Sequence, residues 1–260
     1  MNNLVIGNTS QLSYYFPEDY IKISSRNIDF DFHTTQKYDR IYLCFAEQRT
    51  YLLDDIEDFM NINYDYTIKV IDKFEKCCNQ MIFYSTCELW NNCNGPIDID
   101  DEYDYNYSPY IKSKEMITEY IKEHYDNVIV LYPFNFNSPY RRNGFLFGKI
   151  FDSIINDKKI EIGNTYFYRD LVHPKYVVER SILCNCDELI GSGRLIYIND
   201  FIRELYDKMN MTYEYYVNEN INNYINIKRQ TFWKNTYKNE YKKLVEDIIY
   251  ELKKIKYTTS

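Results

Sequence analysis

Long apolar runs are missing from this 260-residue chain. No stretch approaches the roughly 20 consecutive apolar residues that a membrane-spanning helix needs. Residues Met1–Ser10 also lack the basic region and the apolar region of a secretion signal. We therefore expect a soluble protein without a membrane partner.

Clusters of positive charge are missing too. The chain has 31 Lys and Arg against 39 Asp and Glu, which gives a formal net charge of −8 and a pI near 5.1. Proteins that bind the phosphate backbone need clustered Lys and Arg, because the release of counterions drives that binding. The charge balance argues against nucleic acid as a partner.

The seven cysteines include no Cys-x-x-Cys pair. An odd number of unpaired cysteines indicates reduced thiols and a cytoplasmic protein. Cys184 and Cys186 stand near His173 in the sequence, but their spacing matches no common zinc site. We therefore expect no metal.

What the chain does contain is 45% hydrophobic residues, which is enough for a buried core. In the first half, short apolar runs alternate with longer periodic segments, an order typical of a parallel sheet covered by helices. The expected strands cover residues 4–6, 20–23, 40–46, 81–84 and 128–131, and the expected helices cover about 54–77 and 110–124. This order predicts an α/β fold.

After Pro133 the pattern changes to one that indicates a smaller lobe. Helices are expected near residues 145–156, 199–209 and 234–256, and short strands near 160–162 and 166–168. The acidic, Tyr-rich stretch 98–107 between the two parts is expected to be a surface loop.

Tyr110 and Lys114 stand four residues apart on a predicted helix, so a phenol and an ammonium lie on one face. A neighbouring Lys⁺ favours the phenolate form of Tyr, and the phenol can then exchange a proton near neutral pH. Thr86 follows a predicted strand, at the carboxyl end where α/β sheets form their sites. The three side chains are candidates for catalysis.

These residues resemble the active-site region of extended short-chain dehydrogenase/reductases. The likeness lies in Thr86 after a strand, a loop with Pro96, and the run Ser108-Pro-Tyr-Ile-Lys-Ser-Lys114. The resemblance implies a Rossmann-like doubly wound sheet with a smaller C-terminal substrate-binding lobe. Residues 1–133 would form the NAD(P)-binding domain, with a later contribution from about 166–186, and residues 134–260 would mainly form the lobe.

Three further segments are similar to the family in order. Asn63-Tyr-Asp-Tyr-Thr67 resembles an Asn-x-x-Gly-Thr segment whose Asn supports the catalytic Lys, with Tyr66 in place of Gly. The turn from Phe134 to Pro139 implies that Asn135 meets the nucleotide sugar. The stretch Tyr168-Arg-Asp-Leu-Val-His173 implies that Arg169 holds the substrate diphosphate, beside His173, and a bidentate guanidinium suits that role.

The cofactor fingerprint is altered. The family pattern Gly-x-x-Gly-x-x-Gly is replaced by Gly7-Asn-Thr-Ser-Gln-Leu-Ser13, in which two glycines have become serines. Ser is a small polar residue whose hydroxyl can itself donate to phosphate. The residues implied in cofactor binding are Gly7, Thr9, Ser10, Gln11, Leu12, Ser24, Ser25, Arg26, Cys44, Phe45, Ala46, Lys114 and Pro133.

The cofactor is expected to be NADP(H), with NAD(H) as an alternative. NAD-specific relatives carry an acidic residue after the second strand, where this chain has Ser24-Ser-Arg26, and Arg26 suits a 2′-phosphate. The segment from Arg26 to Asp39 is short, which indicates a trimmed adenine side. Asp29 and Asp31 are both candidates for the adenine contact.

The residues after Thr86 bear on the reaction. Dehydratases of this type resemble Thr-Asp-Glu, whereas this chain has Thr86-Cys87-Glu88, and a thiol is a poorer acid toward a leaving hydroxyl. Cys87 and Glu88 stay candidates for acid or base. The resemblance then implies NADPH-dependent reduction of a keto group on a nucleotide sugar, foremost a 4-keto-6-deoxy sugar in glycan precursor biosynthesis.

Two other readings stay open at this point. One is a 4-epimerase or epimerase-reductase that retains NAD(P), and the other is a non-catalytic sugar-nucleotide-binding protein with an eroded cofactor site. The family also implies a homodimer formed through two helices per subunit.

Overall fold

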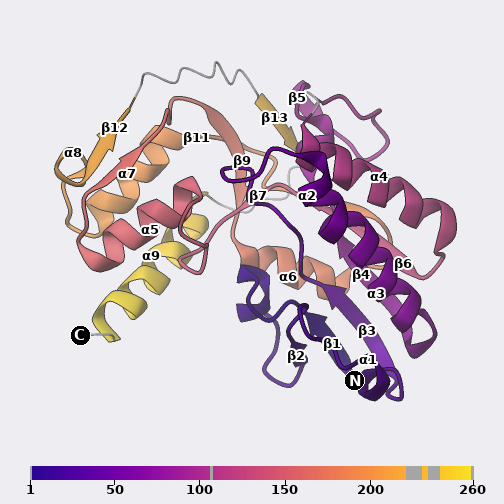
Figure 1. Ribbon diagram of the computed structural model, residues 1–260. Coiled ribbons are helices and arrows are strands. Elements are labelled where there is room, and N and C mark those ends of the chain that lie inside the picture. Colours follow the sequence, from indigo (N-terminus) through magenta and orange to yellow (C-terminus); the bar gives the residue numbers. More distant parts are fainter. Residues whose placement is uncertain (1, 106–107, 221–229, 234–240, 259–260) are drawn as a thin grey trace. The chain divides into compact units, whose positions relative to one another are not determined.

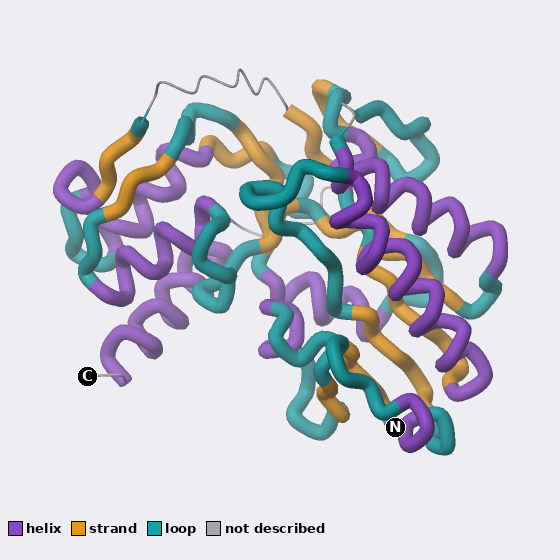
Figure 2. Tube along the Cα trace, in the orientation of Figure 1, coloured by secondary structure: helices purple, strands orange, loops and turns teal. Residues whose placement is uncertain are grey.

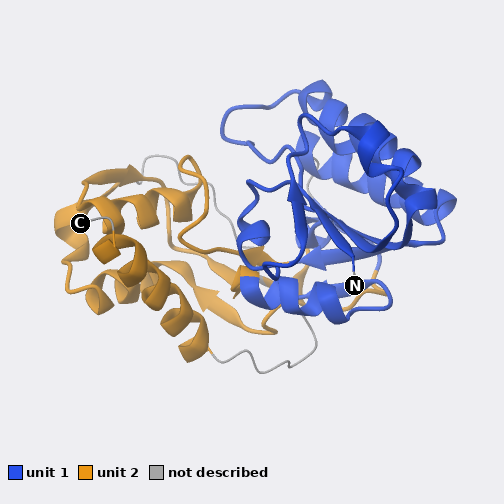
Figure 3. Ribbon diagram, turned by 90° about the horizontal axis from the view of Figure 1, so that it is seen from below, with its two compact units in different colours: residues 1–91, 102–133, 175–190 blue, residues 92–101, 134–174, 191–260 orange. Residues whose placement is uncertain are grey.

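The structure is a computed structural model that describes residues 2–105, 108–220, 230–233 and 241–258. The chain forms two compact units (Figure 3). Unit 1 comprises residues 1–91, 102–133 and 175–190, and unit 2 comprises residues 92–101, 134–174 and 191–260.

Unit 1 contains a six-stranded parallel sheet in the order β10-β6-β4-β3-β1-β2 (Figure 1). Its strands are β1 (Asn3–Ile6), β2 (Ile21–Ile23), β3 (Tyr38–Leu43), β4 (Cys78–Tyr84), β6 (Val128–Pro133) and β10 (Glu188–Ile190). All four residues of β1 and all six of β6 are buried, as strands covered on both faces require. The predicted α/β fold with a Rossmann-like parallel sheet is confirmed.

The strand order reverses beside β1. The chain passes from β1 to β2 on one side and then to β3 on the other, with Leu4 opposite both Ile21 and Ile41. In open α/β sheets, ligands bind outside the carboxyl ends of the strands at such a switch point. In this sheet, Gly7 follows the carboxyl end of β1 and Cys44 follows the carboxyl end of β3.

Helices cover both faces of this sheet (Figure 1). One face carries α4 (Pro109–His124) and a continuous helical segment made of α2 (Ile56–Met60), the π-helical turn η2 (Asn61–Tyr66) and α3 (Thr67–Phe74), which Figure 2 shows as one rod. The other carries α6 (Pro174–Leu183). Successive side chains of β4 point to opposite faces of the sheet. Phe83 contacts Lys114 of α4 on one face, whereas the Tyr84 hydroxyl donates to Ser181 of α6 at 2.8 Å on the other.

The connections around β2 are short. A single 3₁₀ turn, η1 (Gln11–Tyr14), follows β1, and the four-residue α1 (Phe30–His33) precedes β3. Aromatic rings from the first connection pack on the sheet instead of a long helix: the ring centroids of Phe16 and Tyr42 are 4.6 Å apart. The expected shortening of this side of the sheet is therefore visible in the fold.

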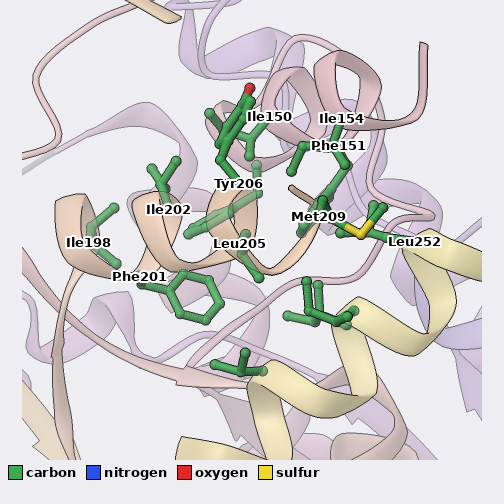
Figure 4. Packing of buried hydrophobic residues seen from close by; sticks show 14 of the residues in the cluster. Ile150, Phe151, Ile154, Ile198, Phe201, Ile202, Leu205, Tyr206, Met209 and Leu252 are labelled. Carbon is green, nitrogen blue, oxygen red and sulfur yellow. The ribbon is translucent and has the colours of Figure 1, made fainter. Parts of the chain in front are cut away.

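Unit 2 is built around a hydrophobic core (Figure 4). Its helices are α5 (Leu146–Asn156), α7 (Ile198–Lys208), α8 (Tyr213–Tyr216) and α9 (Tyr241–Thr258). Its strands are β5 (Asn94–Ile97), β7 (Asn135–Phe136), β8 (Ile160–Ile162), β9 (Tyr168–Val172), β11 (Leu195–Tyr197), β12 (Val217–Glu219) and β13 (Gln230–Trp233). They form a sheet in the order β11-β9-β7 and the pairs β12-β8 and β13-β5.

Several element predictions need correction. The strand expected over residues 40–46 ends at Leu43, and after it the Cys44 N–H makes a last hydrogen bond to the Ile6 carbonyl of β1. The strand expected near 166–168 is β9, which begins at Tyr168. α6 and β10 were not predicted, and part of the helix expected from residue 234, up to residue 240, lies outside the described residues.

Across the described ranges, none of the helices has the length and apolar character to cross a bilayer.

Candidate active site

Thr86 lies two residues beyond the carboxyl end of β4. Its backbone is extended, and its hydroxyl caps the short helix η4 (Cys87–Trp90) by accepting a hydrogen bond from the Glu88 N–H at 3.1 Å. Only 6% of Thr86 is exposed. Cys87 is buried on the same turn, and Glu88 is half-buried. This hydrogen bond holds the Thr86 hydroxyl in one place beyond the carboxyl end of β4.

Helix α4 carries Tyr110 and Lys114. Ser108 caps its N-terminus by accepting from the Ile111 N–H at 3.3 Å, and Pro109 occupies the first turn, where its missing N–H is not needed. Tyr110 therefore lies in the first turn and is half-buried, with its ring centroid 5.9 Å from that of Phe59. Lys114 follows one turn later on the same face.

Lys114 is a buried ammonium group. Its Nζ donates to the carbonyl of Tyr84 at 2.7 Å and lies 4.7 Å from the ring centroid of Phe83. Burial lowers the pKa of Lys114 from 10.5 to about 7, because desolvation disfavours the charged form. The bond to Tyr84 joins α4 to the strand that precedes Thr86. Lys114 and Thr86 therefore lie at the same strand end, and Tyr110 precedes Lys114 by one turn of α4.

Asn63 connects α4 to a neighbouring loop. It is 2% exposed and lies in the π-helical turn η2, a form that is frequent at functional sites. Its Nδ2 donates to Ser113 Oγ at 3.0 Å, and the Ser113 hydroxyl in turn donates to the carbonyl of Tyr110 at 2.7 Å. Asn63 therefore supports the first turn of α4 through Ser113, next to Lys114 in the chain.

The loop after β3 is fixed to the same side chain. The Glu47 N–H donates to Asn63 Oδ1 at 2.7 Å, and Asn63 Nδ2 also donates to the Glu47 carbonyl at 3.1 Å. Partial burial alone would raise the pKa of Glu47, but hydrogen bonds from Arg49 hold it below its ordinary value. Glu47 and Ser113 were not among the predicted site residues. Ser113 stands inside the Tyr110–Lys114 motif, whereas nothing in the sequence marks Glu47.

Gly7 makes the turn after β1. Its φ is +113°, and an added Cβ would lie 2.5 Å from the Cys44 carbonyl oxygen, so glycine is required for the close approach of β1 and β3. The turn closes with the Ser10 N–H on the Gly7 carbonyl at 2.9 Å. Ser13, in place of the third family glycine, donates to the same carbonyl at 2.6 Å. The two serines thus hold the turn.

The other predicted contacts of this turn differ in exposure. Thr9 is exposed and Ser10 is half-buried, whereas Gln11 and Leu12 are buried in η1. Because η1 has only four residues, its N-terminus lacks the aligned peptide dipoles of a long helix. The exposed residues of this turn are Asn8 and Thr9.

The loop after β2 holds Ser24, Ser25 and Arg26. Arg26 is exposed, and its N–H donates to Ser24 Oγ at 3.2 Å. The carbonyl of Ser25 accepts a hydrogen bond from the hydroxyl of Tyr66, the residue that stands in place of a family glycine. At the candidate adenine-contact positions, Asp29 caps α1 by accepting from Phe32 N–H at 3.0 Å, and Asp31 lies in the first turn of α1.

The remaining predicted cofactor contacts also lie in unit 1. Cys44 is buried and its N–H donates to the carbonyl of Ile6 at 2.8 Å, while Phe45 and Ala46 are half-buried. The ring of Phe45 meets that of Tyr66 edge-on, with centroids 5.6 Å apart. Pro133 ends β6, opposite Ile190.

Asn135, Arg169 and His173 lie in unit 2. Asn135 pairs with Leu171, so Asn135 and Arg169 are on the same face of the sheet. The Arg169 guanidinium lies 4.5 Å from the Phe167 ring centroid and donates to the Tyr168 carbonyl at 2.7 Å. His173 is 3% exposed, with Nε2 3.4 Å from Glu251 of α9. His173 directly follows β9, and its buried side chain lies against α9.

Asp170 is a further residue that the motif analysis did not single out. It is fully buried, and its carboxylate accepts hydrogen bonds from Ser192 N–H at 2.7 Å, Ser192 Oγ at 2.6 Å and Gly193 N–H at 3.0 Å. It fixes the turn before β11, beside Arg169. Asp170 lies between Arg169 and His173 in the segment Tyr168–His173, and this position could have marked it as a site residue.

No group of three or more metal-ligating side chains is gathered in the part of the chain that the structure describes.

A comparison with family models shows the family of this chain. A family model described as the NAD dependent epimerase/dehydratase family matches residues 19–184, more than half of the chain. The match begins after the Gly7–Ser13 turn, where the sequence departs from the glycine-rich pattern. A search of curated proteins gives no match.

Solved structures share the fold over nearly the whole chain. A UDP-glucose 4-epimerase from Thermotoga maritima with UDP-glucose has a TM-score of 0.78 at 15% identity, covering 98% of this chain and 99% of its own. A dTDP-glucose 4,6-dehydratase from Streptomyces venezuelae with NAD bound scores 0.77 at 14% identity, covering 98% and 97%. RMD from Pseudomonas aeruginosa, complexed with NADPH, scores 0.75 at 14% identity, covering 98% and 100%.

Proposed function

The chain belongs to the NAD dependent epimerase/dehydratase family, and on that basis we propose that it reduces a keto group on a nucleotide-activated sugar with NADPH. The preferred substrate is a 4-keto-6-deoxy sugar nucleotide, and the product serves glycan precursor synthesis. The observation that carries the proposal is the position of Lys114, whose Nζ bonds the carbonyl of Tyr84 at the strand end that precedes Thr86.

The residues of unit 1 fit a nicotinamide dinucleotide. Gly7 adopts a backbone conformation that few other residues could, and it allows β1 and β3 to approach closely at the switch point. Lys114 has three ammonium hydrogens, of which one is used on Tyr84, so it can also donate to ribose hydroxyls. When bound, the reduced nicotinamide supplies the hydride for the carbonyl carbon.

Tyr110 is the proton donor in this proposal. Its hydroxyl gives a proton to the carbonyl oxygen as the oxygen gains negative charge. A protonated Lys114 one turn away favours the phenolate that remains. Thr86 donates its hydroxyl hydrogen to the same oxygen and orients it, while one lone pair of the hydroxyl accepts from the Glu88 N–H.

Two observations favour reduction over dehydration. Cys87 stands in the position of the dehydratase acid and is buried, with 7% exposure. A thiol, with an ordinary pKa near 8.5, is a poorer acid toward a leaving hydroxyl than a carboxylic acid. Within the Thr86–Glu88 turn, Glu88 supplies one carboxylate, whereas elimination of water needs an acid and a base.

Arg169 and Asn135 are proposed to hold the substrate diphosphate and sugar. They share one face of the sheet of unit 2, and the Phe167 ring beneath the guanidinium keeps it oriented. The fold relatives bind comparable molecules, since the Thermotoga maritima epimerase is crystallised with UDP-glucose.

A 4-epimerase that retains its cofactor is the second candidate. It uses the same Thr, Tyr and Lys, and the similarity in fold to UDP-glucose 4-epimerase supports it. A non-catalytic binding protein is disfavoured because the Asn63–Ser113–Tyr110 bonds and the buried Lys114 are retained.

The variant Tyr110→Phe tests the proposal. It removes the donated proton and leaves the ring, so we expect turnover to fall at least 100-fold, about the lower contribution of a general acid, while NADPH affinity stays within about twofold. Cys87→Ser serves as the matched control and should keep most of the turnover. Near-normal turnover in Tyr110→Phe would refute the mechanism.

A further inference from the structure

We infer that Tyr66 is a positioning residue that sets the preference for a 2′-phosphorylated adenosine by fixing the peptide group before Arg26. This inference rests on the cofactor assignment in the proposed function. Tyr66 is half-buried in the π-helical turn η2, and its hydroxyl donates to the carbonyl of Ser25. The edge of its ring packs with Phe45, with the centroids 5.6 Å apart.

The peptide group between Ser25 and Arg26 is held at both ends. Its carbonyl accepts from Tyr66, and its N–H donates to Ser24 Oγ at 3.2 Å. A peptide group is planar, so these two bonds fix the orientation of the whole unit. The side chain of Arg26 therefore starts from a fixed Cα.

This loop has little other support. The strand before it has three residues and lies at the edge of the sheet, and the next helix has four. Within the described residues, the hydrogen bond that joins Ser24–Arg26 to another element comes from the Tyr66 hydroxyl. A side chain from η2 thus stabilises a loop that a longer crossover would otherwise hold in place.

The same π-helical turn supports the catalytic helix. Asn63, three residues before Tyr66, bonds Ser113 on α4 and both backbone groups of Glu47 after β3. One turn of helix therefore fixes the loop after β2, the loop after β3 and the first turn of α4 relative to one another. Arg26 is held at a set position with respect to Lys114, as a bound dinucleotide requires.

The ligand class follows from Arg26. A guanidinium forms bidentate hydrogen bonds with a phosphomonoester, and a Lys or a mobile Arg does so less well. An Arg on a fixed peptide loses less conformational freedom when it binds than one on a free loop. Tyr66 therefore acts through Arg26 and does not contact the phosphate itself.

The test compares two adenosine probes by calorimetry, adenosine 2′,5′-bisphosphate and 5′-AMP. The wild type should bind the bisphosphate more tightly, and Tyr66→Phe should lower that preference about fivefold, the equivalent of one lost hydrogen bond, with little change for 5′-AMP. Tyr64→Phe, on the same turn, is the matched control and should keep the wild-type ratio. Hydrogen exchange at the Arg26 amide should be faster in Tyr66→Phe than in Tyr64→Phe.

The outcomes separate the two proposals. An unchanged ratio or unchanged Arg26 exchange in Tyr66→Phe overturns the role of Tyr66 alone. A wild type that does not prefer the bisphosphate overturns both this inference and the NADPH assignment. Failure to reduce a keto sugar, by contrast, leaves the binding ratio intact and counts only against the proposed reaction.

Discussion

The burial of the Lys114 ammonium group lowers the stability of the folded protein where the group is charged. The folded protein holds it in a buried position where its pKa is about 7, whereas an unfolded chain gives it an ordinary pKa near 10.4. Between these values the unfolded chain binds more protons at this site. Stability attributable to Lys114 therefore rises with pH across that window and is lowest below pH 7.

Lys114→Met tests this effect. The variant removes the buried charge, so its free energy of unfolding should exceed that of the wild type at pH 6. At pH 9 this difference in free energy of unfolding should be smaller by about 2–3 kcal/mol, because one pKa unit corresponds to about 1.4 kcal/mol. Urea unfolding at both values measures it. A gap that does not change with pH would show that the site is not desolvated as described.

At the scale of single residues, the sequence indicated candidate side chains for catalysis but not what holds them in place. Tyr110 and Lys114 could be recognised because their spacing matches a helix turn. The bonds of Asn63 to Ser113 and Glu47 could not, because they join segments 50 and 16 residues apart. The contact of Tyr66 with Ser25 was hidden for the same reason, although its replacement of a glycine marked the position.

At the scale of elements, α6 is fixed to the sheet by Arg40 of β3. The Arg40 guanidinium donates to the carbonyls of Ser181 at 3.2 Å, Ile182 at 2.9 Å and Cys184 at 2.7 Å. These carbonyls lie at the C-terminal end of the helix, where acceptors lack partners and a cation is favoured.

We expect Arg40→Met to lower the free energy of unfolding by about 2–3 kcal/mol, because hydrogen bonds to a charged donor are among the stronger ones. Arg26→Met, at an exposed position, is the control and should change it by less than about 0.5 kcal/mol. Denaturant unfolding measures both. Equal stabilities of the two variants would contradict the role given to Arg40.

Most of the elements that the sequence predicted well have a strong period or a fully apolar run, and α4 was marked by its Tyr110–Lys114 motif. The continuous helical segment α2–η2–α3 and α4 were predicted within a few residues, as were β1 and β6. α6 and β10 were missed because α6 has only weak amphipathicity and β10 has three residues. The strands of unit 2 are short, and their pairing depends on tertiary contacts that no local pattern encodes.

At the scale of the whole molecule, the parallel sheet covered by helices was predictable from the order of apolar runs, and its doubly wound arrangement was implied by the family resemblance. What was not predictable is the division of the chain: unit 2 includes residues 92–101, which follow the Thr86 turn in sequence, because β5 pairs with β13. That pairing joins segments more than 130 residues apart and leaves no trace in a local pattern.

In the proposed function, the protein transfers a hydride from NADPH to a keto sugar. To test this, a nucleotide 4-keto-6-deoxy sugar is supplied with NADPH that carries deuterium at the transferred position, and the sugar is then analysed by mass spectrometry. We expect stoichiometric NADPH oxidation and one deuterium per product molecule at the reduced carbon. Sugar conversion without NADPH oxidation and without deuterium would contradict it and indicate an epimerase with retained cofactor.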